Sequence, residues 1–404
     1  MEIRPILHSM RRSKTGAVLV AAQIALTLAI VCNAVFIVKA RLAGAQRPSG
    51  VVEDEVFQLL YAPIGEPADP IAASLRDLQI LRAIPGVKHV AEVNSIPLSR
   101  SGWGTGIATD PAKPETSIGV AAYFSGSSFV QALGLEIVEG RDFTEAEVRL
   151  VDPKTRALLP DHVIVSQHFS KRVFPTESAL GKTLYLGTGP TARPIRVIGV
   201  VKTLMSSQAG DSPDAYNAAI FPLRAGRMNY VIRTAPEDRA RVMAEAERQL
   251  SLADNRRVLV WERTMEQIRE RRFRNERGGA NLLIAITVGL LLVTASGIVG
   301  IASLWVNQRK KQIGVRRALG ARRVDIIRYF ITENVIITTV GIVLGIVLAL
   351  ALNQLLVSKV ELARLPLTYV GGGTLAAWAL GLLAVLGPAW RAASVPPAVA
   401  TRST

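Results

Sequence analysis

The sequence holds four long apolar segments, at residues 15–38, 280–306, 329–357 and 370–388. Three of them contain no charged residue, and the third contains only Glu333. A helix needs about 20 mainly apolar residues to cross a hydrocarbon core of roughly 30 Å. One such segment could be a buried helix of a soluble protein, but four of them predict an α-helical membrane protein with four transmembrane helices. The first segment is longer than the roughly 7–15-residue core of a secretory signal, so we expect a retained anchor.

The basic residues are concentrated beside these segments and predict their orientation. Residues 1–14, 307–328 and 389–404 carry fourteen Lys and Arg but only two acidic residues. Residues 39–279, in contrast, carry 32 basic and 28 acidic residues. Basic residues close to a span stay on the cytoplasmic side. We therefore predict that both termini and the loop 307–328 are cytoplasmic, whereas the large insert and the short loop 358–369 lie outside.

Composition and short motifs argue against several other classes. A net charge of +16 would suit a nucleic-acid-binding protein, but 49% of the chain is apolar, so no nucleic-acid partner is expected. The single cysteine, Cys32, excludes an internal disulfide. His162 and His168 lack metal-ligand spacing, so no metal site is expected. Residues 181–183, Gly-Lys-Thr, end like a phosphate-binding loop, but Thr176 stands where that loop needs glycine. We expect no nucleotide site and no catalytic residue in this chain.

Residues 39–260 are expected to form a mixed α/β domain outside the membrane. β-branched and alternating runs bounded by turn residues predict strands at 87–93 and 194–201. A proline followed by apolar residues at helical spacing predicts a helix over 236–250. The order of the elements favours two subdomains, with a second lobe inserted at about residues 121–201.

A highly charged segment separates this domain from the second apolar segment. Residues 261–277 hold ten charged side chains and neither Pro nor Gly, and opposite charges recur three or four residues apart. We predict a charged stalk helix over residues 261–279, either merely solvated or acting as a rigid lever between the external domain and the membrane. The acidic run 53–55 is expected only to solvate a polar segment. The residues assigned to the stalk are Glu266, Arg269, Glu270, Arg272 and Phe273.

Small and polar residues inside the spans predict contacts between helices. Gly341 and Gly345 are four residues apart, a spacing typical of a helix-packing face within a bundle or between two copies. Gly297 and Gly300 form a similar, weaker pair. Glu333 lies one turn into the third span, where an ionisable side chain either pairs with Arg328 or a neighbouring helix or takes part in transport.

The loop 307–328 combines eight basic residues with apolar residues at short-helix spacing. This pattern indicates either a basic helix on the membrane surface or a docking helix for a cytoplasmic partner. It contains the run Gln312, Ile313, Gly314, Val315, Arg316, Arg317, Ala318, Leu319, Gly320 and Ala321.

That run resembles the signature Glu-Ile-Gly-(Ile/Val)-Arg-x-Ala-Leu-Gly-Ala of the MacB/FtsX-like permeases of ABC transporters. Gln312 departs from it, because the family usually has Glu there. Further resemblances lie in the external domain, at residues 81–87, 132–144, 179–184 and 197–201. Together with the topology of one span, a large domain and three spans, these segments identify the chain as resembling this family over most of its length.

The resemblance implies a permease of the bacterial inner membrane that works as a pair, as a homodimer or a heterodimer. The run 312–321 would be the coupling helix that docks into a separate cytoplasmic ABC ATPase. ATP and Mg²⁺ would be bound by that ATPase, with no cofactor on this chain. The family's mechanism, mechanotransmission, would move the stalk helices and squeeze the periplasmic domains.

The resemblance leaves three functions open. The first is export of a peptide, antibiotic or lipidic molecule from the periplasm, with a periplasmic adaptor and an outer-membrane channel as further partners. The second is release of lipoproteins from the membrane. The third is an FtsX-like regulator that activates a cell-wall hydrolase and transports nothing. The 241-residue insert at positions 39–279 favours the first two functions.

Overall fold

The computed structural model shows two compact units, and each is described by itself. One, the helical unit, comprises Met1–Ala43 and Asn275–Thr404; the other, the α/β unit, comprises Gly44–Arg274. The predicted cytoplasmic N-terminus up to residue 13 and the end of the predicted tail, 395–404, lie outside the described residues. The structure describes residues 14–394 apart from 66–68, 127, 152–159, 211 and 361–362.

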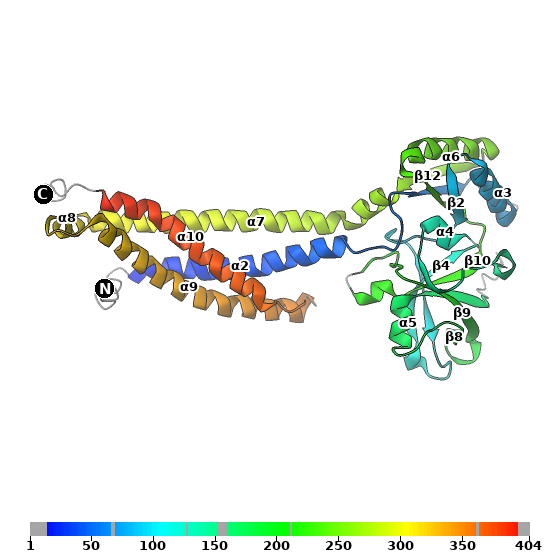
Figure 1. Ribbon diagram of the computed structural model, residues 1–404, viewed down its shortest axis with the longest axis horizontal. Helices are drawn as coiled ribbons and strands as arrows, with labels where there is room; N and C mark the ends of the chain where they lie inside the picture. The colour runs from blue at the N-terminus through cyan, green and yellow to red at the C-terminus, as the bar shows by residue number, and fades with distance from the viewer. Residues whose placement is uncertain are drawn as a thin grey trace. The chain divides into compact units, whose positions relative to one another are not determined.

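Four long helices dominate the helical unit (Figure 1). Each is long and apolar enough to cross a membrane, which confirms the four-span prediction within the described residues. They are α2 (Lys14–Ala45), α7 (Met265–Gln308), α9 (Arg323–Val360) and α10 (Leu367–Ala393). Every helix extends beyond its predicted apolar segment at both ends. Much of the predicted loop 307–328 is therefore helical, and it contains the short helix α8 (Lys310–Ala318).

Buried polar side chains connect the helices of this unit. The Nδ2 of Asn33 on α2 donates to the carbonyl of Ala349 on α9 at 3.1 Å. The Nδ2 of Asn334 on α9 donates to the carbonyl of Gly381 on α10 at 2.8 Å. Polar groups without access to water need such partners, and hydrogen bonds between helices stabilise membrane bundles. The contacts fix α9 against both α2 and α10.

The first lobe of the α/β unit is a four-stranded antiparallel sheet in the order β12-β1-β11-β2. Two helices, α3 (Pro70–Ala83) and α6 (Arg239–Ala253), pack on one face over a core that includes Leu59, Leu81 and Val242. The strands are β1 (Val56–Pro63), β2 (Val87–Glu92), β11 (Asn229–Thr234) and β12 (Arg257–Thr264). The strand predicted at 87–93 is β2.

The second lobe is an eight-stranded sheet in which β4 pairs with both β3 and β10, so that the strands close into a barrel. Alternate residues such as Val163, Val165 and Val197 fill its interior, as the two-residue period of a strand requires. The strand predicted at 194–201 is β9. The strands are β3 (Trp103–Ala108), β4 (Ile118–Ser125), β5 (Ile137–Gly140), β6 (Arg149–Leu150), β7 (His162–Ser166), β8 (Thr183–Leu186), β9 (Arg193–Val201) and β10 (Ala218–Arg224).

The second lobe is larger than the predicted span of residues 121–201. Its strands extend from Trp103 to Arg224, because β3 and β10 are needed to close the barrel. The glycines of β3 conceal its strand pattern, and β10 contains Pro222, which weakens a strand prediction. The local sequence of each strand therefore explains why the predicted lobe was too short.

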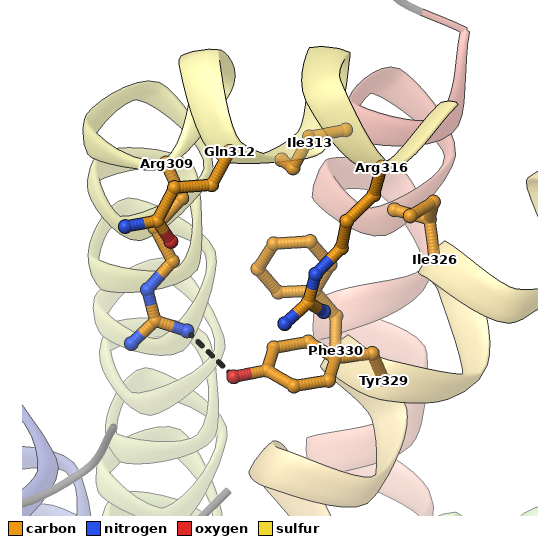
Figure 2. A pocket seen from close by; sticks show the side chains of 7 residues that line it. All are labelled: Arg309, Gln312, Ile313, Arg316, Ile326, Tyr329 and Phe330. Carbon is orange, nitrogen blue, oxygen red and sulfur yellow. Dashed lines mark hydrogen bonds between the residues drawn. The ribbon is translucent and has the colours of Figure 1, made fainter. Parts of the chain in front are cut away.

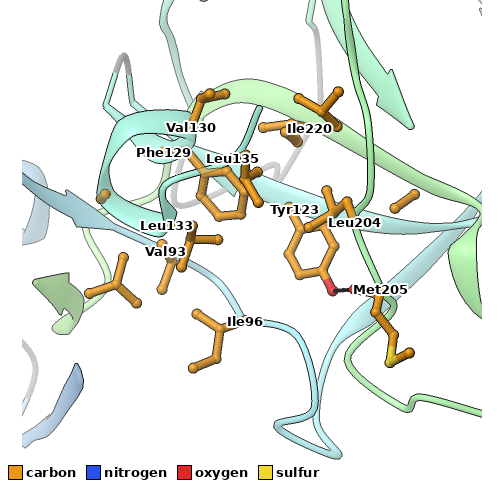
Figure 3. Close-up of a cluster of buried hydrophobic side chains, with 14 of the residues drawn as sticks. Val93, Ile96, Tyr123, Phe129, Val130, Leu133, Leu135, Leu204, Met205 and Ile220 are labelled. Atoms are coloured by element: carbon orange, nitrogen blue, oxygen red, sulfur yellow. Dashed lines mark hydrogen bonds between the residues drawn. The ribbon is translucent and has the colours of Figure 1, made fainter. Parts of the chain in front are cut away.

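One hydrophobic cluster joins the two lobes inside the α/β unit (Figure 3). Phe129 and Leu133 of the short helix α4 (Phe129–Leu133) are completely buried in it. Tyr123 of β4 is also buried, and its hydroxyl donates to the main-chain carbonyl of Met205 at 2.6 Å. The cluster therefore fixes the segment that follows β9 against the barrel.

Candidate functional site

The predicted coupling segment forms α8 and the turn that follows it. Gly320 has a φ of +98°, in the left-handed region that glycine adopts without strain. The amides of Gly320 and Ala321 donate to the carbonyls of Arg317 and Arg316 at 3.1 and 3.0 Å, a pattern that ends a helix as a Schellman motif. The glycine of the signature thus terminates α8 and lets the chain turn into α9.

The apolar side chains of this segment divide into a buried and an exposed set. Ile313 is buried in the hydrophobic cluster of the helical unit, and Gly314, the next residue, is also buried. Val315 and Leu319 are 52% and 82% exposed. Because Val315 lies on, and Leu319 directly after, the basic helix that carries the predicted coupling run, the two residues mark a candidate surface for a partner protein.

A charged contact fixes the beginning of α8 to α9. Arg309, directly before α8, donates from both Nη atoms to the carboxylate of Glu333, at 2.8 and 3.1 Å. It also lies 3.5 Å from the hydroxyl of Tyr329 (Figure 2). The Glu333 side chain is 1% exposed, so the ion pair is shielded from water. The partner of Glu333 is thus Arg309 of the preceding segment and not Arg328.

Two arginines of the predicted coupling segment, Arg316 and Arg317, fix the other end of α8. The guanidinium of Arg316 lies 5.2 Å from the ring centre of Tyr329, a distance typical of a cation–π contact. Arg317 donates to the main-chain carbonyl of Ala393 on α10 at 3.0 Å. Gln312 lines a small cavity of about 20 Å³ between Arg309 and Arg316 (Figure 2). The helix α8 is therefore attached to both α9 and α10.

The stalk helix begins at Met265, four residues after its predicted start. Residues 261–264 belong to β12 and pair with β1. The amide of Thr264 donates to Oε1 of Gln267 at 3.1 Å, and the amide of Gln267 donates to Oγ1 of Thr264 at 3.3 Å. This reciprocal arrangement is a capping box, which starts a helix after the threonine. The spacing Thr-x-x-Gln was the sequence signal for the correct boundary.

Apolar residues bury the first turns of α7 in the α/β unit. Met265, Ile268 and Phe273 are 0%, 5% and 1% exposed and belong to the cluster that joins the lobes. Glu270 lies on the exposed side of these turns. The predicted stalk is thus solvated on one face only, and its other face is part of the core.

Ion pairs and hydrogen bonds to main-chain carbonyls attach the same turns to three parts of the α/β unit. Arg269 donates to both carboxylate oxygens of Glu53, at 2.7 and 2.5 Å, and to the carbonyl of Ala45 at 2.8 Å. Glu266 accepts from Arg239 of α6 at 2.8 Å. Arg272 donates to the carbonyl of Gln208 at 2.8 Å. The stalk is therefore held by the first lobe, the segment after β9 and the link between α2 and β1.

The acidic run 53–55, expected only to solvate a polar segment, has a structural role. Besides the Glu53 contact with Arg269, Glu55 accepts from Lys88 at 2.7 Å and from Arg233 at 2.5 Å. These hydrogen bonds, that of Lys88 first, lower the pKa of the Glu55 carboxyl from its ordinary value. The run therefore stabilises the start of the α/β unit, and is not merely a solvated segment.

Comparison with known proteins then decides the family. The model of the MacB-like periplasmic core domain matches residues 21–249, more than half of the chain. The chain belongs to the MacB/FtsX-like permease family. The model of the FtsX-like permease C-terminal region matches residues 284–397, which include α8 and the last two spans. The mixed α/β unit and the apolar helices of this permease are therefore an extracytoplasmic domain and its membrane part.

Individual relatives of this MacB/FtsX-like permease are exporters. The pyoverdine export ATP-binding/permease protein of Pseudomonas aeruginosa is 27% identical over 366 residues, which cover 85% of this chain and 49% of that protein. The macrolide export ATP-binding/permease protein MacB of Aggregatibacter actinomycetemcomitans is 30% identical over 240 residues, covering 56% of this chain and 34% of that protein. The permease thus spans about half the length of these relatives, or less.

Among solved structures, the periplasmic region of MacB from Actinobacillus actinomycetemcomitans is 14% identical, with a TM-score of 0.34. It covers 55% of this chain and 93% of that chain. The extracellular domain of the transporter YknZ is 18% identical, with the same TM-score, and covers 51% of this chain and 100% of that chain.

The four glycines predicted to lie at helix contacts differ in how closely other atoms approach them. A Cβ atom at Gly341 would lie 2.8 Å from the carbonyl oxygen of Ala21 on α2, and one at Gly345 would lie 3.0 Å from Leu28. These two glycines therefore let α9 approach α2 within one chain. A Cβ at Gly297 would meet the side chain of Gln23 at 2.5 Å, whereas one at Gly300 would meet nothing within 4 Å.

Replacing Gly341 with Leu is expected to destabilise the helical unit by about 1–3 kcal/mol, because the new side chain forces α9 away from α2. Thermal unfolding of the full chain in detergent measures the effect. Gly300→Leu is the matched control, since the same side chain there enters open space. Equal melting temperatures for the two variants would show that α9 does not pack on α2 through this glycine.

Proposed function

We propose that this chain is the non-catalytic permease subunit of an ABC exporter, and that a separate cytoplasmic ATPase binds α8. The observation that carries the proposal is the pair of exposed apolar side chains, Val315 and Leu319, on a basic helix attached to two membrane helices. A docking helix needs exposed apolar anchors and rigid support. Both features occur in the segment that matches the family's coupling signature.

The proposal places ATP and Mg²⁺ on the partner chain. The 404 residues contain no complete phosphate-binding loop, which supports this placement. The protein works in the bacterial inner membrane with both termini in the cytoplasm and the α/β unit in the periplasm. The basic segments beside the spans support this orientation.

The stalk acts as the lever in this proposal. The helix α7 is continuous from Met265 to Gln308, so one element contains both the anchored stalk turns and the membrane span that leads to α8. A helix transmits axial displacement better than a flexible loop does. Two permease copies act together, and ATP binding by the ATPases moves the paired stalks and changes the periplasmic domains without a conventional pore.

The names of the relatives indicate the substrate class in general terms only. Relatives named for pyoverdine export and macrolide export favour export over lipoprotein release or hydrolase regulation. The cargo is a peptide, antibiotic or lipidic molecule, and a periplasmic adaptor with an outer-membrane channel completes the route outward.

The test is purification of the full chain from its native membrane under mild conditions, followed by measurement of vanadate-sensitive ATP hydrolysis. We expect ATPase activity to copurify with the wild type. The variant Arg316→Glu reverses the charge at the surface of α8 and should lose this activity. Equal activity with both proteins, or none with the wild type, would contradict the proposal.

A further inference from the structure

A small cationic cavity lies between α8 and α9 in the helical unit (Figure 2). Its volume is about 20 Å³, which is enough for a group about the size of one water molecule. Two of its lining residues, Gln312 and Arg316, are exposed, so the cavity opens to the surface. A larger molecule can therefore place one polar group in it while the remainder of that molecule stays outside.

One tyrosine positions two guanidinium groups at this cavity. Arg309 lies 3.5 Å from the hydroxyl of Tyr329, and the guanidinium of Arg316 lies 5.2 Å from the centre of the same ring. All three residues line the cavity, and Figure 2 shows both arginine side chains reaching toward the tyrosine. Because the planar donors of a guanidinium match the oxygens of a phosphate, such a site is suited to a phosphate group.

The positive charge of Arg316 is not compensated within the described part of the chain. Arg316 makes no ion pair or hydrogen bond with a described residue, and no carboxylate is among the described residues that line the cavity. Glu333 already binds both Nη atoms of Arg309. Asp325, the nearest acidic residue in the sequence, accepts from the amide of Arg322 at 2.9 Å. The cavity therefore attracts an anion from outside the chain.

Gln312 lines the same cavity and is the position at which this chain departs from the family signature. The signature has Glu there, and a carboxylate at this place would supply the counter-charge that Arg316 lacks. The amide of Gln312 leaves that charge uncompensated and adds an N–H donor. The departure from the signature therefore fits a cavity whose anion comes from another molecule.

The place and the lining of the cavity indicate a lipid as the source of this anion. The lining residues closely follow the apolar segment 280–306 or surround the start of the segment 329–357, where a membrane surface is expected. Ile313, Ile326 and Phe330 make the rest of the lining apolar. A phospholipid carries its phosphate beside an apolar part, whereas free phosphate gains nothing from apolar neighbours. Basic pockets between membrane helices are known to bind anionic headgroups.

We propose that this cavity binds a phosphate oxygen of an anionic phospholipid, with the guanidinium of Arg316 and the amide of Gln312 donating to it. The lipid belongs to the cytoplasmic leaflet, an assignment that rests on the orientation proposed above. Val315 and Leu319 do not line the cavity, so the bound lipid leaves the proposed ATPase surface free. The lipid attaches α8 to the membrane surface, in addition to its contacts with α9 and α10.

The test measures lipid binding to the full chain, purified in a neutral detergent without an ATPase, by native mass spectrometry. Phosphatidylglycerol, which is anionic, and phosphatidylcholine, which is zwitterionic, are titrated with the same acyl chains. We expect the wild type to bind its first phosphatidylglycerol about tenfold more tightly than phosphatidylcholine, or better. Isothermal titration of inorganic phosphate into the same preparation should show no saturable heat. Saturable binding of inorganic phosphate would identify a free-anion site and contradict the lipid assignment.

The variant Gln312→Glu places the carboxylate of the signature at the cavity. It should lower the affinity for phosphatidylglycerol about tenfold or more and leave phosphatidylcholine binding unchanged. Gln308→Glu is the matched control, because it makes the same change at a nearby exposed residue that does not line the cavity. This control should bind both lipids as the wild type does. Arg316→Gln removes the positive charge and should weaken phosphatidylglycerol binding as Gln312→Glu does, and thermal unfolding shows whether each variant is folded.

Equal affinity of the wild type for the two lipids, or equal weakening by Gln312→Glu and Gln308→Glu, would overturn the inference. The basic segment would then attract anions only through its overall charge. None of these measurements contains an ATPase. A failure of the copurification experiment therefore contradicts the proposed function alone, and a failure of the lipid titrations contradicts the lipid site alone.

Discussion

Replacing Leu319 with Asp is expected to weaken binding of the ATPase by about 2 kcal/mol or more, roughly 30-fold in the dissociation constant. The leucine is 82% exposed at the end of α8, so it contributes little to the fold of the chain itself. A carboxylate there removes the apolar anchor and introduces a charge that the interface would have to desolvate. Titration of the purified ATPase onto the full chain in nanodiscs measures the change.

Leu252→Asp is the matched control for this prediction. That leucine is 72% exposed on α6 of the α/β unit, so the same chemical change is made at a similarly accessible position far from α8 in the sequence. Binding should be unchanged. A Leu319→Asp variant that binds as tightly as the control would show that the exposed side chains of α8 are not the docking surface.

Replacing Glu333 with Ala is expected to destabilise the attachment of α8 by about 3–5 kcal/mol, because the guanidinium of Arg309 loses its charged partner in a buried site. Hydrogen exchange of the amides in α8 measures the free energy of local opening in the full chain. The signature residues of α8 remain unchanged in this variant, so a loss of ATPase stimulation would report positioning and not contact.

A double-mutant cycle measures the interaction energy between Arg309 and Glu333 apart from the effects of each substitution on its other neighbours. The double variant Arg309→Ala, Glu333→Ala should lower the free energy of local opening of α8 by much less than the sum of the two single variants, because neither charge is left unpaired. Additive effects would mean that Arg309 and Glu333 do not interact in the membrane. The 2.8 Å and 3.1 Å contacts would then not describe the working protein.

The sequence predicted the spans and the strands at 87–93 and 194–201 because both depend on local patterns. Four uncharged or nearly uncharged segments leave few alternatives to membrane helices, and the β-branched run at 194–201 has the two-residue period of a strand. The coupling segment was recognised by its resemblance to a family signature. Its exposed residues, Val315 and Leu319, were identified only by the structure.

The remaining features depend on contacts between distant positions. Arg309 and Glu333 are 24 residues apart, and Glu53 and Arg269 are 216 apart, so no local pattern indicates either pair. The glycines of β3 concealed a strand that closes the barrel. The start of the stalk differs from these cases, since the local spacing Thr264-x-x-Gln267 already indicates a helix that begins after the threonine.

The distance between the stalks of two permease copies tests the central claim most directly. Arg274 is an exposed residue of α7. A spin label is attached at Arg274→Cys in a chain whose native cysteine is replaced by Cys32→Ser. Pulsed electron–electron double resonance then measures the distance between the two labels in the complex with the ATPase. The account predicts that ATP shortens the distance in the wild-type background and leaves it unchanged with Leu319→Asp. An ATP-bound complex with the same distance as the nucleotide-free one would contradict it.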